Sequence, residues 1–177
     1  MGINFGNNVT QTLPAVTLQV VDYYYNSINN WSTNSNTYQR VFTFNMTPKV
    51  SNSKVIVTLE LCGYNSNGGH DNNFRLGYQI NGGSASYIGA NPSVPSGNGS
   101  YNLHGNVRGD HRVNSWTETW MNRLTGSWSA GATVTFFVDT IGEGTWYANQ
   151  GNSTGQTRFG RGTSKMVIEE IMPWVMN

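Results

Sequence analysis

Residues 41–63 read VFTFNMTPKVSNSKVIVTLELCG, two alternating apolar runs separated by a short connection rich in Pro, Asn and Ser. Side chains alternate between the two sides of a strand, so each run has one apolar side and one more polar side. The stretch therefore predicts a β-hairpin of two half-buried strands. Its apolar sides are formed by Phe42, Phe44 and Met46 in the first strand and by Val55, Val57, Leu59 and Leu61 in the second.

Strand-like patterns continue on both sides of this stretch, and Gly, Pro and Asn interrupt every candidate helix. We expect further strands at 16–25, 74–80, 131–140 and 163–172, a loop at 26–36, and a tight turn at Asn81-Gly82-Gly83. About eight to ten short strands separated by turns predict an all-β chain folded as an antiparallel sandwich or jelly roll. The expected division is an irregular N-terminal arm at 1–15, a β-sandwich domain at 16–172 and a C-terminal tail at 173–177.

Composition limits the classes of function. The 177 residues fit one domain, and charged residues are only 11%, with a net charge of +1. This balance argues against a nucleic-acid surface built from clustered Lys and Arg. No signal peptide and no apolar run of membrane-spanning length is found, so we expect no membrane insertion and no secretion by the signal-peptide route. The single cysteine, Cys62, lies in an apolar run and is interpreted as a core residue.

No motif indicates catalysis, so we predict no catalytic residue and no cofactor. His70-Asp71 and Asp110-His111 lie in Gly-rich segments, but their spacing matches no metal site and we expect no metal. Glu169 and Glu170 are adjacent and face opposite sides of a strand, which makes them a poor acid–base pair. A glutamate turned inward would need a partner. The arginines considered for this structural ion pair are Arg40, Arg75, Arg123, Arg158 and Arg161.

Aromatic residues make up 12% of the chain, and several stand beside Asn in polar segments. Flat rings next to amide groups suit glycan or partner contact, whereas the alternative is that the same rings fill a core or a subunit interface. The candidate contact residues are Trp31, Tyr64, Asn65, Trp146, Tyr147 and Asn149. The second side of the strand that begins at Lys54 is less polar than a fully solvated one, which suggests subunit contact through Lys54, Ile56 and Glu60. Glu169 and Glu170 are further candidates, because one of these two opposed side chains faces either the interior or a subunit contact.

Three segments in order carry a family resemblance: LQVVDYYYNS at 18–27, FNMTPKVSNSKVIVTLELCGY at 44–64 and GRGTSKMVIEEI at 160–171. Together they resemble the C-terminal β domain of tail-fibre-like and other virion surface proteins of tailed bacteriophages, particularly the cyanophage type. The resemblance covers residues 18–171. It implies a jelly-roll-like β-sandwich, a homotrimer, synthesis in the host cytoplasm and display on the surface of a virus particle.

The function implied by this resemblance is that of a non-enzymatic virion structural protein. Tail association with host-surface binding is the first version, with other virion proteins and a host cell-surface glycan as partners. Capsid decoration that stabilises the head is the close alternative. A carbohydrate-binding module unrelated to phage and a glycan-degrading enzyme are the further alternatives.

Overall fold

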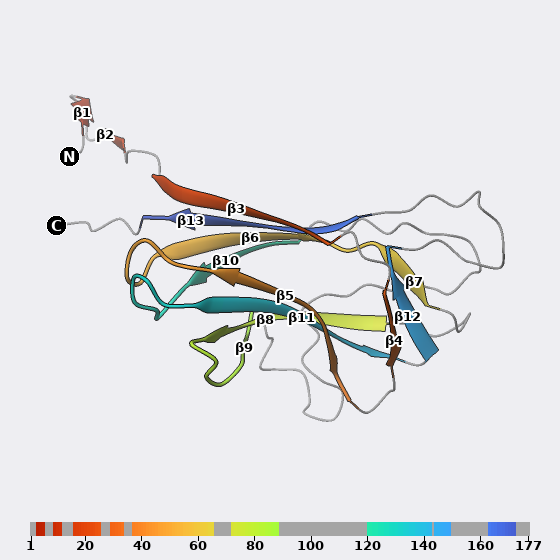
Figure 1. Ribbon diagram of the computed structural model, residues 1–177. Coiled ribbons are helices and arrows are strands. Elements are labelled where there is room, and N and C mark those ends of the chain that lie inside the picture. The colour runs from red at the N-terminus through yellow and green to blue at the C-terminus, as the bar shows by residue number, and fades with distance from the viewer. Residues whose placement is uncertain are drawn as a thin grey trace, which may run out of the picture.

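The computed structural model describes residues 3–5, 9–11, 16–25, 29–33, 37–65, 72–88, 120–142, 144–149 and 163–172. Within these ranges the chain forms strands and turns and no helix, and every strand pair is antiparallel. Two four-stranded sheets lie face to face (Figure 1), an arrangement consistent with a β-sandwich. The prediction of an all-β antiparallel chain is therefore confirmed.

The two main sheets contain eight strands, within the predicted range, and two smaller sheets bring the described total to thirteen. Sheet 1 has the order β10 (Trp120–Thr125), β6 (Lys54–Glu60), β13 (Ser164–Ile171) and β3 (Thr17–Tyr25). Sheet 2 has the order β5 (Gln39–Met46), β11 (Val134–Gly142), β8 (Asn72–Ile80) and β9 (Ser86–Tyr87). The end sheet has the order β4 (Asn29–Thr33), β12 (Gly144–Ala148) and β7 (Gly63–Asn65).

The predicted hairpin over 41–63 is wrong. Its two strands belong to different sheets, because β5 pairs with β11 in sheet 2 while β6 pairs with β10 and β13 in sheet 1. The connection at 47–53 crosses from one sheet to the other. Both apolar sides still face the same interior, so alternation identified the buried side correctly without identifying the pairing partner.

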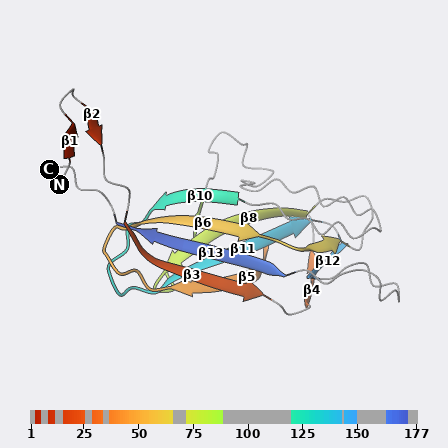
Figure 2. The ribbon, with the colours of Figure 1, turned by 90° about the horizontal axis from the view of Figure 1, so that it is seen from above.

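Two other expectations near the N-terminus also change. The expected loop at 26–36 contains β4, a short polar strand without visible alternation that pairs with β12. The expected irregular arm contains β1 (Ile3–Phe5) paired with β2 (Val9–Gln11), and this hairpin lies beyond the end of the sandwich (Figures 1 and 2). The division into arm, domain and tail stays a prediction, and 173–177 lies outside the described residues.

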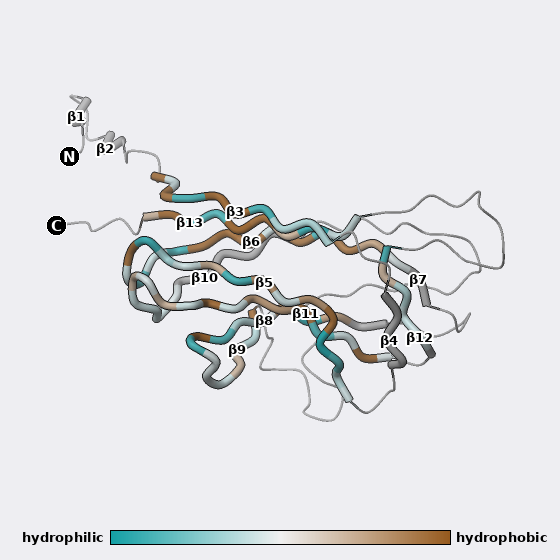
Figure 3. Tube along the Cα trace, viewed as in Figure 1, coloured by the Kyte–Doolittle hydropathy of each residue, from teal (hydrophilic) through white to brown (hydrophobic). Residues whose placement is uncertain are grey.

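The interior is filled by alternate side chains of both main sheets, as the alternating burial along β13 shows. In Figure 3 apolar residues occur along the strands of both sheets. Val55, Val57, Leu59 and Leu61 are at most 2% exposed, which confirms the predicted core side of β6. Burying each such side chain is worth about 1.5–3 kcal/mol. The predicted strands at 16–25, 74–80, 131–140 and 163–172 correspond to β3, β8, β11 and β13, and the predicted turn joins β8 to β9.

The sheet-crossing connection is fixed by the segment that leads from β10 to β11. The Trp128 indole is 1% exposed and donates from Nε1 to Ser53 Oγ over 2.9 Å, while Asn52 N donates to the Trp128 carbonyl over 2.9 Å. Gly126 lies against this ring, since a Cβ there would stand 2.1–2.2 Å from three indole atoms. The ring therefore occupies the space that a side chain at position 126 would need.

We expect Gly126→Ala to lower the free energy of unfolding by about 1–3 kcal/mol, the usual cost of overpacking a filled interior. Equilibrium unfolding in urea measures the loss. Ser127→Ala, at the exposed neighbouring position, should change stability by less than about 0.5 kcal/mol. Equal stability of the two variants would contradict the tight packing of Trp128 on Gly126.

Candidate functional site

The end sheet contains five of the six residues predicted for glycan or partner contact. They come from three distant parts of the chain, because β4 contains Trp31, β7 contains Tyr64 and Asn65, and β12 contains Trp146 and Tyr147. The register sets Trp146 opposite Trp31 and Asn65, and Tyr147 opposite Tyr64. Asn149 follows β12 directly. The sheet lies at one end of the sandwich, at the right in Figure 1.

Trp146 is not available as a sugar platform, which corrects its prediction as a contact residue. It is 1% exposed, and its ring meets Phe42 edge-on at 5.7 Å and Phe74 at 5.3 Å between centroids. Gly63 leaves room for the indole, since a Cβ at this position would lie 2.9 Å from Trp146 Cζ2. Because neighbouring side chains alternate, Tyr147 points to the other side of the strand and is only half-buried.

Asn149 is also a structural residue rather than a contact residue. It is 1% exposed and adopts a φ of 57°, a left-handed conformation that Asn tolerates. Its Oδ1 accepts from Ser164 N at 2.8 Å and from Ser164 Oγ at 2.9 Å, and its Nδ2 donates to the Tyr25 carbonyl. Its backbone N donates to the Cys62 carbonyl at 2.8 Å. Asn149 therefore connects β3, β13 and the segment before β7.

Cys62 lies beside this amide network and is buried, as predicted. Its backbone N donates to Ser164 Oγ over 3.0 Å. The interpretation of Cys62 as a packed core residue is confirmed. Of the six candidate contact residues, Tyr147 is the one whose described side chain is neither fully buried nor placed in the core cluster.

We expect Trp146→Ala to lower the free energy of unfolding by about 3–5 kcal/mol, as truncation of a buried aromatic side chain does. Thermal and urea unfolding measure the effect. Thr145→Ala, at the half-buried neighbouring position, is the control and should cost less than about 1.5 kcal/mol. Unchanged stability of the Trp146 variant would contradict its assignment as a core residue and would make it a candidate for surface contact again.

The outer face of sheet 1, the side turned away from sheet 2, carries most of the predicted subunit-contact residues. Lys54 is exposed there, and Ile56, Glu60 and Glu169 are half-buried. Glu60 Oε1 lies 2.9 Å from Lys165 Nζ, and this hydrogen bond raises the pKa of Lys165. The large apolar side chains exposed on β3 or at the adjoining strand ends are Val16, Val20, Tyr24 and Met172. This outer face stays the candidate surface for subunit contact.

Glu170 is the exception, and its predicted role in subunit contact is wrong. It is fully buried on the inner side of β13, where its carboxylate accepts from Lys49 N at 2.9 and 3.0 Å and from Val50 N at 3.2 Å. Gln19 Nε2 donates to Glu170 Oε2 at 2.6 Å. The expected arginine partner is therefore replaced by backbone and amide donors from the connection at 47–53 and from β3.

We expect Glu170→Gln to lower the free energy of unfolding by about 1–3 kcal/mol, because the new amide donor group would face the Lys49 and Val50 N–H groups. Glu169→Gln, the adjacent change on the outer face, should cost less than about 0.5 kcal/mol. Chemical unfolding of both variants, measured side by side, distinguishes the buried carboxylate of Glu170 from the outer carboxylate of Glu169. The assignment fails if both variants lose the same amount.

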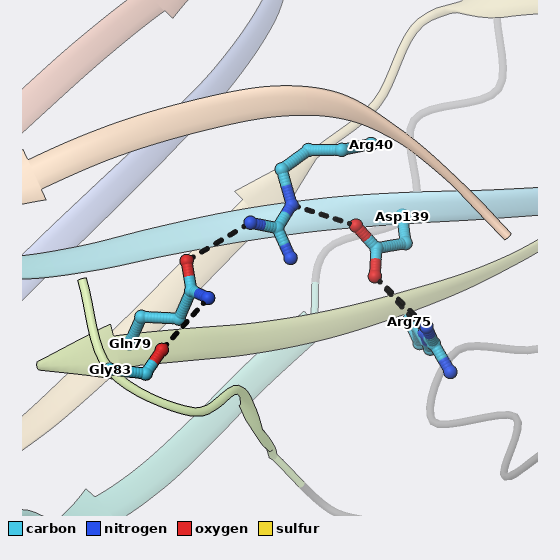
Figure 4. Close-up of polar contacts among 5 residues, drawn as sticks. All are labelled: Arg40, Arg75, Gln79, Gly83 and Asp139. Carbon is cyan, nitrogen blue, oxygen red and sulfur yellow. Dashed lines mark hydrogen bonds and ion pairs between the residues drawn. The ribbon is translucent and has the colours of Figure 1, made fainter.

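Arg40 and Arg75 instead hold Asp139, a cluster that reading the sequence missed (Figure 4). Asp139 interrupts the apolar run of β11 and is 4% exposed. A carboxylate at a buried strand position requires charged or hydrogen-bonding partners, and this was the available signal. The register of β11 then supplies the partners, since Asp139 pairs with Arg40 in β5 and with Arg75 in β8.

Metal and membrane features are absent from the part of the chain that the structure describes. No group of three or more His, Cys, Asp and Glu side chains among the described residues is placed to hold a metal ion. The loop pairs His70-Asp71 and Asp110-His111 lie outside the described ranges. No helix that could cross a bilayer occurs in the described ranges.

Comparison with known proteins adds no relative. No protein-family model matches the chain, and no curated protein matches it.

Proposed function

We propose that this chain is a non-enzymatic structural protein of a tailed-bacteriophage particle, displayed on the particle surface and folded as a jelly roll. The observation that supports it most is strand order. Along the chain, the eight strands of the main sheets are β3, β5, β6, β8, β9, β10, β11 and β13, which can be numbered one to eight. The spatial order in sheet 1, starting from β3, is then one, eight, three, six. The spatial order in sheet 2, starting from β5, is two, seven, four, five. This is the order of a jelly roll, a fold that recurs in viral capsid and lectin domains.

The three segments of the family resemblance support the proposal in a second way. They correspond to β3, to the sheet-crossing connection with its flanking strands, and to β13. These segments meet at one hydrogen-bond cluster, in which Gln19, Lys49 and Val50 all donate to Glu170. The shared motifs thus coincide with residues that hold the fold, so the resemblance is chiefly a resemblance of fold.

The proposed assembly is a homotrimer formed through the outer face of sheet 1. Val20 is 54% exposed and Tyr24 is 63% exposed on β3, the edge strand of that sheet. Lysine and glutamate side chains lie among these apolar groups, so two copies can meet without strong charge repulsion. The same surface also suits the alternative of capsid decoration, in which it would cover capsid subunits.

Tail association with host-surface binding is the preferred version, with a host glycan and other virion proteins as partners. Of the predicted contact residues, Tyr147 remains the described candidate for this role. A density map of the whole particle is the deciding experiment. Density for this chain at the tail favours host binding, density over the head lattice favours decoration, and absence from the particle overturns the proposal.

We expect the purified chain to sediment as a trimer at micromolar concentration, and Val20→Arg or Tyr24→Arg to shift it to monomer. An added charge on the proposed contact surface would lose its hydration when two copies meet. Thr43→Arg, at an exposed position of sheet 2, is the matched control and should leave the trimer intact. A monomeric wild-type chain in analytical ultracentrifugation would contradict the trimer.

A further inference from the structure

The outer face of sheet 2 carries two guanidinium groups around one buried carboxylate (Figure 4). Asp139 Oδ1 accepts from Arg40 Nε at 3.1 Å. Asp139 Oδ2 accepts from Arg75 Nε at 3.2 Å and from Arg75 Nη2 at 3.1 Å. Asp139 is the only acidic residue in the four strands of this sheet, and Arg40 and Arg75 are the only basic ones. Two cations and one anion give these four strands an excess positive charge.

The guanidinium of Arg40 is held in one position by an aromatic ring and by a hydrogen-bonded glutamine side chain. Its guanidinium lies over the Phe137 ring, with 3.5 Å between Cζ and the ring centroid. Phe137 is itself buried beside Gly77, where a Cβ would stand 2.5 Å from the ring. Arg40 Nη1 donates to Gln79 Oε1 at 3.1 Å, and Gln79 Nε2 donates to the Gly83 carbonyl at 3.0 Å. The cation is therefore ordered without any ligand.

Arg40 nevertheless keeps hydrogen-bonding capacity toward solvent. Its side chain is 38% exposed, whereas that of Arg75 is 19% exposed and lies against the rings of Tyr38 and Tyr87. A guanidinium has five N–H donors. Among the described contacts Arg40 uses Nε and Nη1, so Nη2 stays open. One guanidinium suffices to neutralise Asp139, so the second leaves a cation fixed at the surface with Nη2 open.

The surrounding side chains are neutral hydrogen-bonding groups. Thr43 and Asn45 are exposed on β5, and Thr135 Oγ1 donates to Asn45 Oδ1 at 2.8 Å. A planar guanidinium fork matches the geometry of a carboxylate or a phosphate, and amide and hydroxyl groups match the hydroxyls of a sugar. The combination selects a ligand that carries one acid group among many hydroxyl groups.

We infer that the outer face of sheet 2 binds an acidic carbohydrate, with Arg40 as the residue that pairs with its carboxylate or acid ester. The inference rests on the proposed host-surface function and specifies the class of glycan. Gln79 and Phe137 are positioning residues, because they fix the guanidinium rather than contact the ligand. Binding an ordered side chain avoids much of the entropy cost of fixing a flexible one.

Isothermal titration calorimetry with paired probes tests this. Trigalacturonic acid and its methyl ester share one sugar backbone, but the ester replaces each charged carboxylate with a neutral methylated group. Dextran sulfate with plain dextran tests a sulfate ester instead of a carboxylate. We expect at least one acidic probe to bind roughly tenfold or more tightly than its neutral counterpart, as a charged hydrogen-bonded pair implies. The preference should weaken as salt is raised.

Gln79→Glu is the deciding variant, because it places a carboxylate on the Arg40 fork and removes the excess charge while the side chain keeps its size. It should abolish the preference for the acidic probe. Arg40→Gln should do the same but also removes a donor from buried Asp139, so its thermal stability must be measured alongside. Lys49→Gln is the control, since it makes the same change in net charge at an exposed position of the connection at 47–53, keeps the backbone donor to Glu170 and should leave binding unchanged.

Equal binding of acidic and neutral probes, or no binding of either acid, overturns the inference. So does a folded Gln79→Glu variant that retains the preference. Binding of whole particles to host cells is measured separately. A failure of the acidic-carbohydrate site can then be distinguished from a failure of the proposed virion role. If cells still bind particles that carry Gln79→Glu, host binding stands without this site; if the acidic probe binds but the chain is absent from particles, the site stands without the virion role.

Discussion

The buried carboxylate of Glu170 is the interaction on which the arrangement of the two sheets depends. The connection at 47–53 leaves one sheet and enters the other, so the N–H groups of Lys49 and Val50 have no neighbouring strand to bind. Glu170 accepts both, and Gln19 donates to Glu170 and to the Thr47 carbonyl. A buried charge without such donors would be costly. β3, β13 and the connection therefore fix one another's positions.

The two outer faces of the sandwich differ in a way that matches a division of roles. On sheet 1, exposed apolar side chains lie among paired opposite charges, such as Lys165 with Glu60. On sheet 2, the charges are concentrated around Asp139 and the excess is positive. Under the proposed function the first face assembles copies of the chain and the second meets an acidic ligand. Both faces are built on strands whose inner sides are held by the same core.

The end sheet shows how neighbouring aromatic residues take opposite roles. Trp146 and Tyr147 are adjacent in a polar stretch of sequence, but strand alternation turns the indole into the core and leaves the phenol half-buried. Asn149, two residues later, is turned inward by its left-handed backbone and bonds Ser164. The sequence did not show that five of the candidate contact residues lie in one sheet, because β4, β7 and β12 are far apart in the chain.

The sequence by itself determined which side of β5 and of β6 is buried, because alternation is local and records burial directly. This is why Phe44, Val57 and Leu59 were placed correctly. Only the tertiary structure decided which strands pair, that 41–63 crosses between sheets, and what surrounds each buried charge. Glu170 meets Lys49 across 121 positions of sequence, and Asp139 meets Arg40 across 99. Such contacts depend on strand order, which a pattern of period two does not encode.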